Sequence, residues 1–118
     1  MSTLANIAIV LVAVLHGYFL LLEMFFWDKP LGLRTFRLTP EFAAASKKLA
    51  ANQGLYNGFL AAGLVWGLSL GAAGSAVKIF FLSCVIVAGI YGAFSVGKKI
   101  FWTQAMPALL ALVCVRMS

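Results

Sequence analysis

LANIAIVLVAVLHGYFLLLEMFFW, residues 4–27, decides the fold of this chain, because it is an apolar run in which only one histidine and one acidic residue are ionisable. A helix rises about 1.5 Å per residue, so this stretch can cross the roughly 30 Å hydrocarbon core of a bilayer. No Lys or Arg precedes the run and no small-residue cleavage site follows it. We therefore interpret it as a retained membrane span rather than as a signal peptide.

The composition of the whole chain agrees with a membrane protein. Of its 118 residues, 64% are hydrophobic and 10% are charged, whereas a soluble domain carries about 25% charged residues. The net charge of +6 does not indicate nucleic-acid binding, because the Lys and Arg residues lie between apolar runs rather than on one continuous face. Cys84 and Cys114 show no metal-ligand spacing. We expect no metal, no cofactor and no nucleic-acid partner.

Three further apolar runs predict three more spans, at about residues 49–71, 76–97 and 100–115. Before the first of them, residues 28–48 form the only long polar segment. Within it, Thr39, Pro40 and Glu41 indicate a helix start: a hydroxyl cap, a proline at the first helical position, and an acid near the positive end of the helix dipole. Helix two should therefore begin in the headgroup region with an amphipathic turn. We predict an all-α protein, a single domain over residues 1–118.

Short connections set the expected topology of this four-helix transmembrane bundle. The sequence AAGS at 72–75 predicts a tight turn, so the spans should alternate in an antiparallel, up-down order. Seven of the nine Lys and Arg residues fall in the 28–48 segment and at 98–99, and the other two are Lys78 and Arg116. The positive-inside rule then places both charged loops in the cytoplasm and both termini outside.

Glycines recur at four-residue spacing along the second predicted span. Gly54 is followed by Gly58, and Gly63 by Gly67 and Gly71. Such spacing lets a neighbouring helix approach closely in lipid. The neighbour can be another helix of the same chain or a second copy of it, so packing within the monomer and a homodimer through Gly63, Gly67 and Gly71 both stay open.

Two ionisable side chains within the first span are the candidate catalytic residues. His16 and Glu23 are seven residues, or two turns, apart and share one face of the helix. Each costs about 3 kcal/mol or more to place in lipid, which makes it a functional candidate. At about 10 Å of separation along the axis they can flank one small ligand.

Uncharged polar and aromatic side chains extend this inventory. Gln53, Tyr56 and Asn57 form one stripe on helix two. On a common depth scale, most polar residues of the four spans fall in the cytoplasmic leaflet. They either satisfy one another in an interhelical network or line a polar cavity for an amphiphilic ligand, and Glu23 favours the cavity. The candidate substrate-binding residues are Trp27, Asn52, Gln53, Tyr56, Asn57, Tyr91 and Gln104.

Three stretches of the chain are familiar: HGYFLLLEMFFW at 16–27, FRLTPEF at 36–42, and LAANQGLYNGF at 49–59. They resemble the bacterial membrane family catalogued as domain of unknown function 1304. The resemblance extends over essentially the whole chain. It implies a bacterial four-span protein of about this size, which we expect in the cytoplasmic membrane, and it supplies no reaction.

The residues are compatible with three classes of function. The first is binding of a lipophilic small molecule, such as an isoprenoid, a quinone-like compound or a lipid. Glu23 and His16 would then carry protons in a metal-free isomerisation, epimerisation or hydration. The second is a proton-coupled exporter that resembles the small multidrug transporters and uses Glu23, although such sites usually lie nearer the midplane. The third is a non-catalytic membrane subunit or scaffold.

Overall fold

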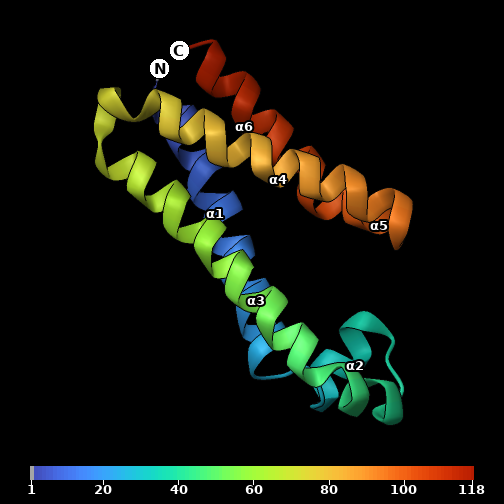
Figure 1. The fold of residues 1–118 in the computed structure, drawn as a ribbon. Helices are drawn as coiled ribbons and strands as arrows, with labels where there is room; N and C mark the ends of the chain where they lie inside the picture. The colour runs from blue at the N-terminus through green and yellow to red at the C-terminus, as the bar shows by residue number, and fades with distance from the viewer. Residues whose placement is uncertain (1) are drawn as a thin grey trace. The chain divides into compact units, whose positions relative to one another are not determined.

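The computed structural model describes residues 2–118, and among them it contains helices and short connections but no β-strand (Figure 1). The elements are α1 (Ser2–Met24), α2 (Pro30–Phe36), α3 (Pro40–Ser69), the 3₁₀ turn η1 (Gly71–Gly74), α4 (Ser75–Ser95), α5 (Lys98–Ile100), the π-helical turn η2 (Phe101–Ala105) and α6 (Met106–Arg116). Three segments are long and apolar enough to cross a membrane: Thr3–Met24, Gly71–Ser95 and Lys98–Arg116. The predicted all-α class is therefore confirmed for these residues, and the three apolar segments are consistent with the predicted membrane protein.

The predicted second span, 49–71, is not among these three segments. It belongs to α3, whose 30 residues correspond to a length of about 45 Å. Helix length is therefore sufficient, but the amides of Asn52, Gln53 and Asn57 make this part of the chain more polar than the other spans. A four-span bundle stays a prediction.

The predicted start of helix two is confirmed. Helix α3 begins at Pro40, and the hydroxyl of Thr39 accepts a hydrogen bond of 3.1 Å from the backbone N–H of Phe42. This bond satisfies one of the amide groups that a helix leaves open in its first turn. The first span, by contrast, ends earlier than predicted, at Met24, because the N–H groups of Phe25 and Phe26 both bond to the carbonyl of Leu21 and the chain then turns.

Helix α2 within the polar segment was not predicted. Its proline, Pro30, occupies the first turn, and Arg37 ends it in the left-handed conformation, with φ of 54°. Seven residues are too few for a helix to be stable alone. Tertiary contacts supply the missing stability, because the ring of Phe36 packs against that of Trp27 with centroids 5.0 Å apart.

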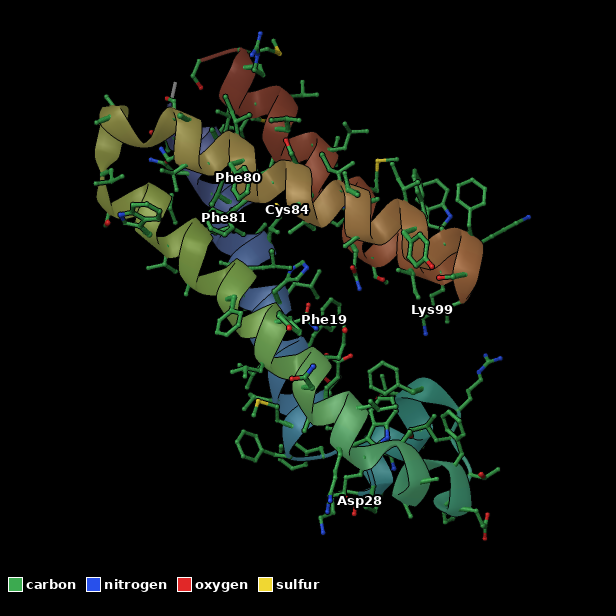
Figure 2. All side chains as sticks on the ribbon, viewed as in Figure 1. Phe19, Asp28, Phe80, Phe81, Cys84 and Lys99 are labelled. Carbon is green, nitrogen blue, oxygen red and sulfur yellow. The ribbon has the colours of Figure 1, made fainter. Side chains whose placement is uncertain are left out.

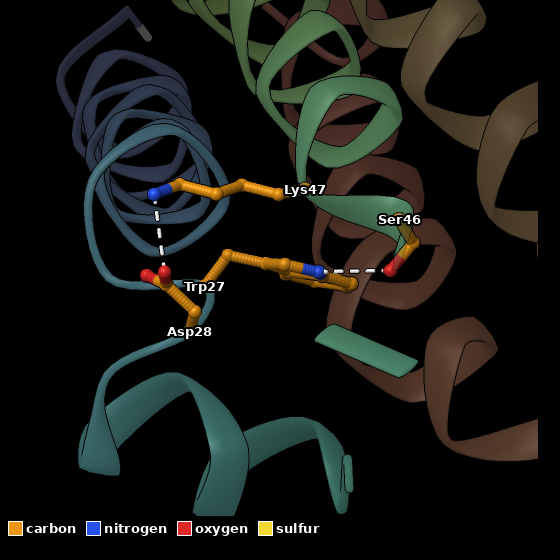
Figure 3. A network of polar contacts seen from close by, with 4 residues as sticks. All are labelled: Trp27, Asp28, Ser46 and Lys47. Atoms are coloured by element: carbon orange, nitrogen blue, oxygen red, sulfur yellow. Dashed lines mark hydrogen bonds and ion pairs between the residues drawn. The ribbon is translucent and has the colours of Figure 1, made fainter. Parts of the chain in front are cut away.

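Two polar contacts tie the turn that follows α1 to the beginning of α3 (Figure 3). The indole Nε1 of Trp27 donates to Ser46 Oγ over 3.1 Å, and Lys47 Nζ lies 3.0 Å from Asp28 Oδ2. The hydrogen bond from Lys47 holds the pKa of Asp28 below its ordinary value. These contacts give the basic 28–48 segment a defined structure.

The chain forms two compact units, residues 1–14 with 60–118 (unit 1) and residues 15–59 (unit 2). The core of unit 1 joins α1, α3, α4 and α6. Its buried residues are Ile9, Val12, Ala13, Leu64, Leu82, Val85, Ala108 and Ala111. Three of these are alanines, so the helices can approach closely, which is how helices associate where lipid removes the hydrophobic drive.

Glycines bring the helices of unit 1 into closest contact. The Cα of Gly63 faces the ring of Phe81, labelled on α4 in Figure 2, and that of Gly67 faces the side chain of Lys78. Helix α4 thus occupies the groove at both glycines, as expected for packing within the monomer. Gly71, with φ of 62° and open space around it, is the first residue of η1, just after α3 ends at Ser69. A homodimer through these glycines stays a prediction.

The last span contains a local widening next to its proline. Pro107 has no N–H, and in a regular helix its ring would clash with the carbonyl four residues earlier. The N–H of Met106 instead bonds to Phe101 O, which makes the π-helical turn η2. Just before the proline, Ala105 is buried against α4 at Gly89.

The contact at Gly89 leads to a stability prediction. A Cβ at Gly89 would lie 2.6 Å from the backbone N of Ala105, whereas a Cβ at Gly17 would meet nothing within 4 Å. Gly89→Ala should therefore lower the free energy of unfolding by about 1–3 kcal/mol through overpacking. Gly17→Ala, the matched control, should raise it by up to about 1 kcal/mol through helix propensity. Circular dichroism during denaturant unfolding in detergent measures both, and equal effects would contradict the close packing of α4 against η2.

Candidate functional site

The central polar contact of unit 2 joins α1 to α3. Asn57 Nδ2 donates a hydrogen bond of 2.6 Å to Glu23 Oε1. Asn57 is buried, with 5% of its surface exposed, and Glu23 is half-buried. A carboxyl group and a carboxamide from two helices thus meet within the part of α1 that is apolar enough to span a membrane.

Two small residues on α3 make this contact possible. A Cβ at Gly54 would lie 2.7 Å from Met24 Cγ and 3.0 Å from Glu23 Cβ, and one at Gly58 would lie 2.6 Å from Leu20 Cδ1. As residue numbers rise along α1 they fall along α3, so the two helices are antiparallel here. The glycines allow a backbone approach close enough for the short side chain of Asn57 to reach Glu23.

The two oxygens of the Glu23 carboxyl group differ. Oε1 is held by Asn57, while Oε2 makes no hydrogen bond to any of residues 2–118. A carboxylate has two oxygens, and each of them can accept hydrogen bonds. Because the side chain is only partly covered, Oε2 is the atom of this site that can accept a hydrogen bond from, or exchange a proton with, a bound molecule.

His16, the second predicted catalytic residue, is fully buried, and its ring meets that of Phe19 edge-on at 5.4 Å between centroids. Seven residues of helix separate it from Glu23, which corresponds to about 10 Å along α1. The two side chains do not contact each other, as expected. A ligand at Glu23 would reach the imidazole only if the side chains around it moved.

The predicted substrate-binding residues divide into four groups. Asn57 faces Glu23, whereas Asn52, Gln53 and Tyr56 are exposed on the surface of α3. Trp27 is held by Ser46 and Phe36. The remaining two, Tyr91 and Gln104, belong to unit 1.

Some partners in this region carried no usable sequence signal. Ser46 lies nineteen positions from Trp27, and nothing in its neighbourhood marks it as the acceptor of the indole. Gly54 and Gly58, in contrast, were detectable by their four-residue spacing. Residues 2–118 bring together no three His, Cys, Asp or Glu side chains that could hold a metal ion.

Comparisons with known proteins place the chain among sequences of unknown function. Residues 10–116 match the family described as "Protein of unknown function (DUF1304)". A relative in Lactococcus lactis subsp. lactis (strain IL1403), the uncharacterised protein YpaA, is 32% identical over 115 residues, which are 96% of this chain and 97% of the relative. No solved structure matches the chain. The expected family is thus confirmed, and this helical, membrane-type chain belongs to the DUF1304 family.

Proposed function

We propose that this protein binds a lipophilic small molecule with a hydrogen-bonding head, and that Glu23 is the residue that recognises the head. The observation that carries the proposal is the asymmetry of the Glu23 carboxyl group. One oxygen is fixed by Asn57 at 2.6 Å, and the other has no partner among residues 2–118. A carboxyl group kept only for packing would gain more from a complete set of partners.

The surroundings of Glu23 favour an amphiphilic ligand over a soluble one. The neighbouring side chains Leu20 and Met24 are apolar and pack against α3, and the exposed neighbours Leu21, Phe25 and Phe26 are apolar as well. A molecule that approaches from lipid can bury its chain against these groups while its head meets Oε2. Hydroxyl, carbonyl or phenol heads of isoprenoid, quinone-like or lipid molecules fit this chemistry.

Catalysis at this site would consist of proton movement. Oε2 can take a proton from one atom of a bound molecule and return it to another, as isomerisation and epimerisation require, or activate water for hydration. Asn57 would hold the carboxyl group in one orientation throughout. His16 would be a second proton carrier after a local rearrangement, and Gln53, Tyr56, Tyr91 and Gln104 would contribute to head-group selectivity.

We further propose that α3 is a fourth span, entering the membrane near Leu49. Its capped start, Thr39 and Pro40, would then lie at the cytoplasmic headgroups together with the basic 28–48 segment. Residues 98–99 would lie on the same side of the bacterial cytoplasmic membrane, and both termini would lie outside. In this arrangement Glu23 lies in the cytoplasmic leaflet.

The fourth span can be tested by labelling the two ends of α3. In a chain whose own Cys84 and Cys114 are replaced by Ala, Ala44→Cys and Ala73→Cys place single thiols at exposed positions. A membrane-impermeant maleimide should label Ala44→Cys only in inside-out vesicles and Ala73→Cys only in right-side-out vesicles. Labelling of both positions from one side would show that α3 does not cross the membrane.

The polar pair makes a prediction about stability. Asn57→Ala leaves a half-buried carboxyl group without its donor and should lower the free energy of unfolding by about 1–3 kcal/mol. Asn52→Ala removes the same side chain from an exposed position on the same helix and should change it by less than about 0.5 kcal/mol. Denaturant unfolding in detergent micelles distinguishes the two, and equal losses would mean that the Glu23–Asn57 bond contributes nothing.

Ligand binding is tested by Glu23→Gln, which keeps the size of the side chain and its contact with Asn57 but removes the proton-carrying group. Mass spectrometry of organic extracts from protein purified in mild detergent should find an apolar compound with the native chain. Its amount should fall on the order of tenfold in Glu23→Gln. Glu41→Gln, the same change at an exposed position, should retain it.

Two results would overturn this function. Extracts that do not differ between Glu23→Gln and the native chain would exclude Glu23 from binding. Efflux of a lipophilic cation from proteoliposomes, driven by a pH gradient and lost in Glu23→Gln, would identify the exporter instead.

A further inference from the structure

Lys78 is an unusual residue in unit 1, because a lysine near the start of an apolar span is expected to extend its ammonium group to water. It is instead buried, with 7% of its surface exposed. Gly67 makes the room: a Cβ there would lie 2.9 Å from Lys78 Cγ. The side chain therefore packs along α3, and Nζ donates one hydrogen bond, 3.3 Å long, to Asn6 Oδ1 on α1.

Unit 1 offers no negative side chain to balance this ammonium group. All three acidic residues of the protein, Glu23, Asp28 and Glu41, belong to unit 2. A buried charge is costly unless it is paired and hydrogen-bonded. A single long bond to a neutral amide uses one of three donors, so two N–H groups of Lys78 remain for a ligand.

A cavity of about 370 Å³ adjoins Lys78, which is within the range of small-molecule sites. Its lining residues, all in unit 1, are Ala5, Asn6, Gly71, Ala72, Ser75, Lys78, Val115 and Ser118. Apart from Lys78, the polar side chains among them are an amide and two hydroxyls. The Ser75 hydroxyl makes only a long bond of 3.4 Å to Ala72 O and can turn toward a ligand.

The position of the cavity indicates where its ligand comes from. Two of the candidate spans begin at Thr3 and at Gly71, and the third ends at Arg116. The residues that line the cavity lie at or near these three span ends. In Figure 1 the last turn of α6 and η1 lie at the same end of unit 1. In a membrane crossed by these spans, the cavity would lie at headgroup depth, where phosphate groups of lipids are concentrated.

We propose that this cavity binds a phosphate group through Lys78, with Asn6 and Ser75 as uncharged partners. The ammonium group supplies the charge, and the two neighbours complete the hydrogen bonds around the phosphate oxygens. A lipid headgroup and free inorganic phosphate share this chemistry. The site is separate from Glu23 and does not depend on the function proposed for that residue.

The test uses the full chain in a non-ionic detergent and three probes: dihexanoyl-phosphatidylglycerol, inorganic phosphate, and dihexanoylglycerol, which has the same acyl chains but no phosphate. Native mass spectrometry resolves the three adducts by mass. We expect one phosphate-bearing probe per chain to bind. Lys78→Met should weaken its binding about tenfold or more, because a charged hydrogen bond is lost.

Two further variants separate recognition from general charge and from folding. Arg116→Met removes the same charge from an exposed residue at the same end of the unit and should change binding by less than about twofold. Lys78→Arg keeps the charge and should retain binding. Unfolding followed by circular dichroism checks that Lys78→Met is folded, as expected for an apolar side chain of similar length.

The outcomes identify the source of the phosphate or overturn the site. Binding of the phospholipid alone would assign a lipid headgroup, and binding of inorganic phosphate would assign the free anion. Equal binding of dihexanoylglycerol and phosphatidylglycerol, no binding of either phosphate-bearing probe, or undiminished binding in Lys78→Met would overturn the proposal.

Discussion

A hydrocarbon surrounding offers polar groups no water, and the rest of this structure depends on that constraint. Backbone amides must bond within their own segment, so the spans are helical. Where a helix departs from regular geometry, the amide still finds an acceptor: Met106 bonds to Phe101 next to Pro107. Helices in lipid also gain little from hydrophobic burial against one another, so close contact depends on small residues such as Gly89, Ala105 and Ala108.

Under the same constraint, two ionisable side chains each have a carboxamide as hydrogen-bond partner. Glu23 in unit 2 is hydrogen-bonded to Asn57, and Lys78 in unit 1 to Asn6. In each pair a glycine on α3 leaves space beside the ionisable residue, Gly54 next to Glu23 and Gly67 next to Lys78. A carboxamide orients an ionisable group without neutralising it, so each group keeps the capacity for further hydrogen bonds. This distinguishes them from Asp28 and Lys47, which neutralise each other at the surface.

Sequence reasoning was most accurate where a local physical rule applied. The helix start at Thr39 and Pro40 followed from capping chemistry, and the tight turn at 72–75 from its glycine and small residues. Sequence reasoning was less accurate in predicting which polar side chains of a helix face a neighbouring helix. The stripe of Gln53, Tyr56 and Asn57 shares one side of α3 by spacing, yet only Asn57 is buried. The geometry of the contact between α1 and α3 decides which residue of the stripe faces α1. Here Gly54 and Gly58 set that contact.

The sequence by itself determined the helical class, the family and the apolar runs long enough to cross a membrane, and it singled out Glu23 as a candidate, because apolar run length, composition and the cost of an acid in lipid are local properties. Tertiary structure alone decided that Asn57 is the partner of Glu23 and that Lys78 is buried rather than extended to water. It also decided that the indole of Trp27 bonds to Ser46 and packs against Phe36 of the short helix α2. Each of these contacts joins residues that are far apart in the chain, and the periodicity of a sequence does not predict contacts of that kind.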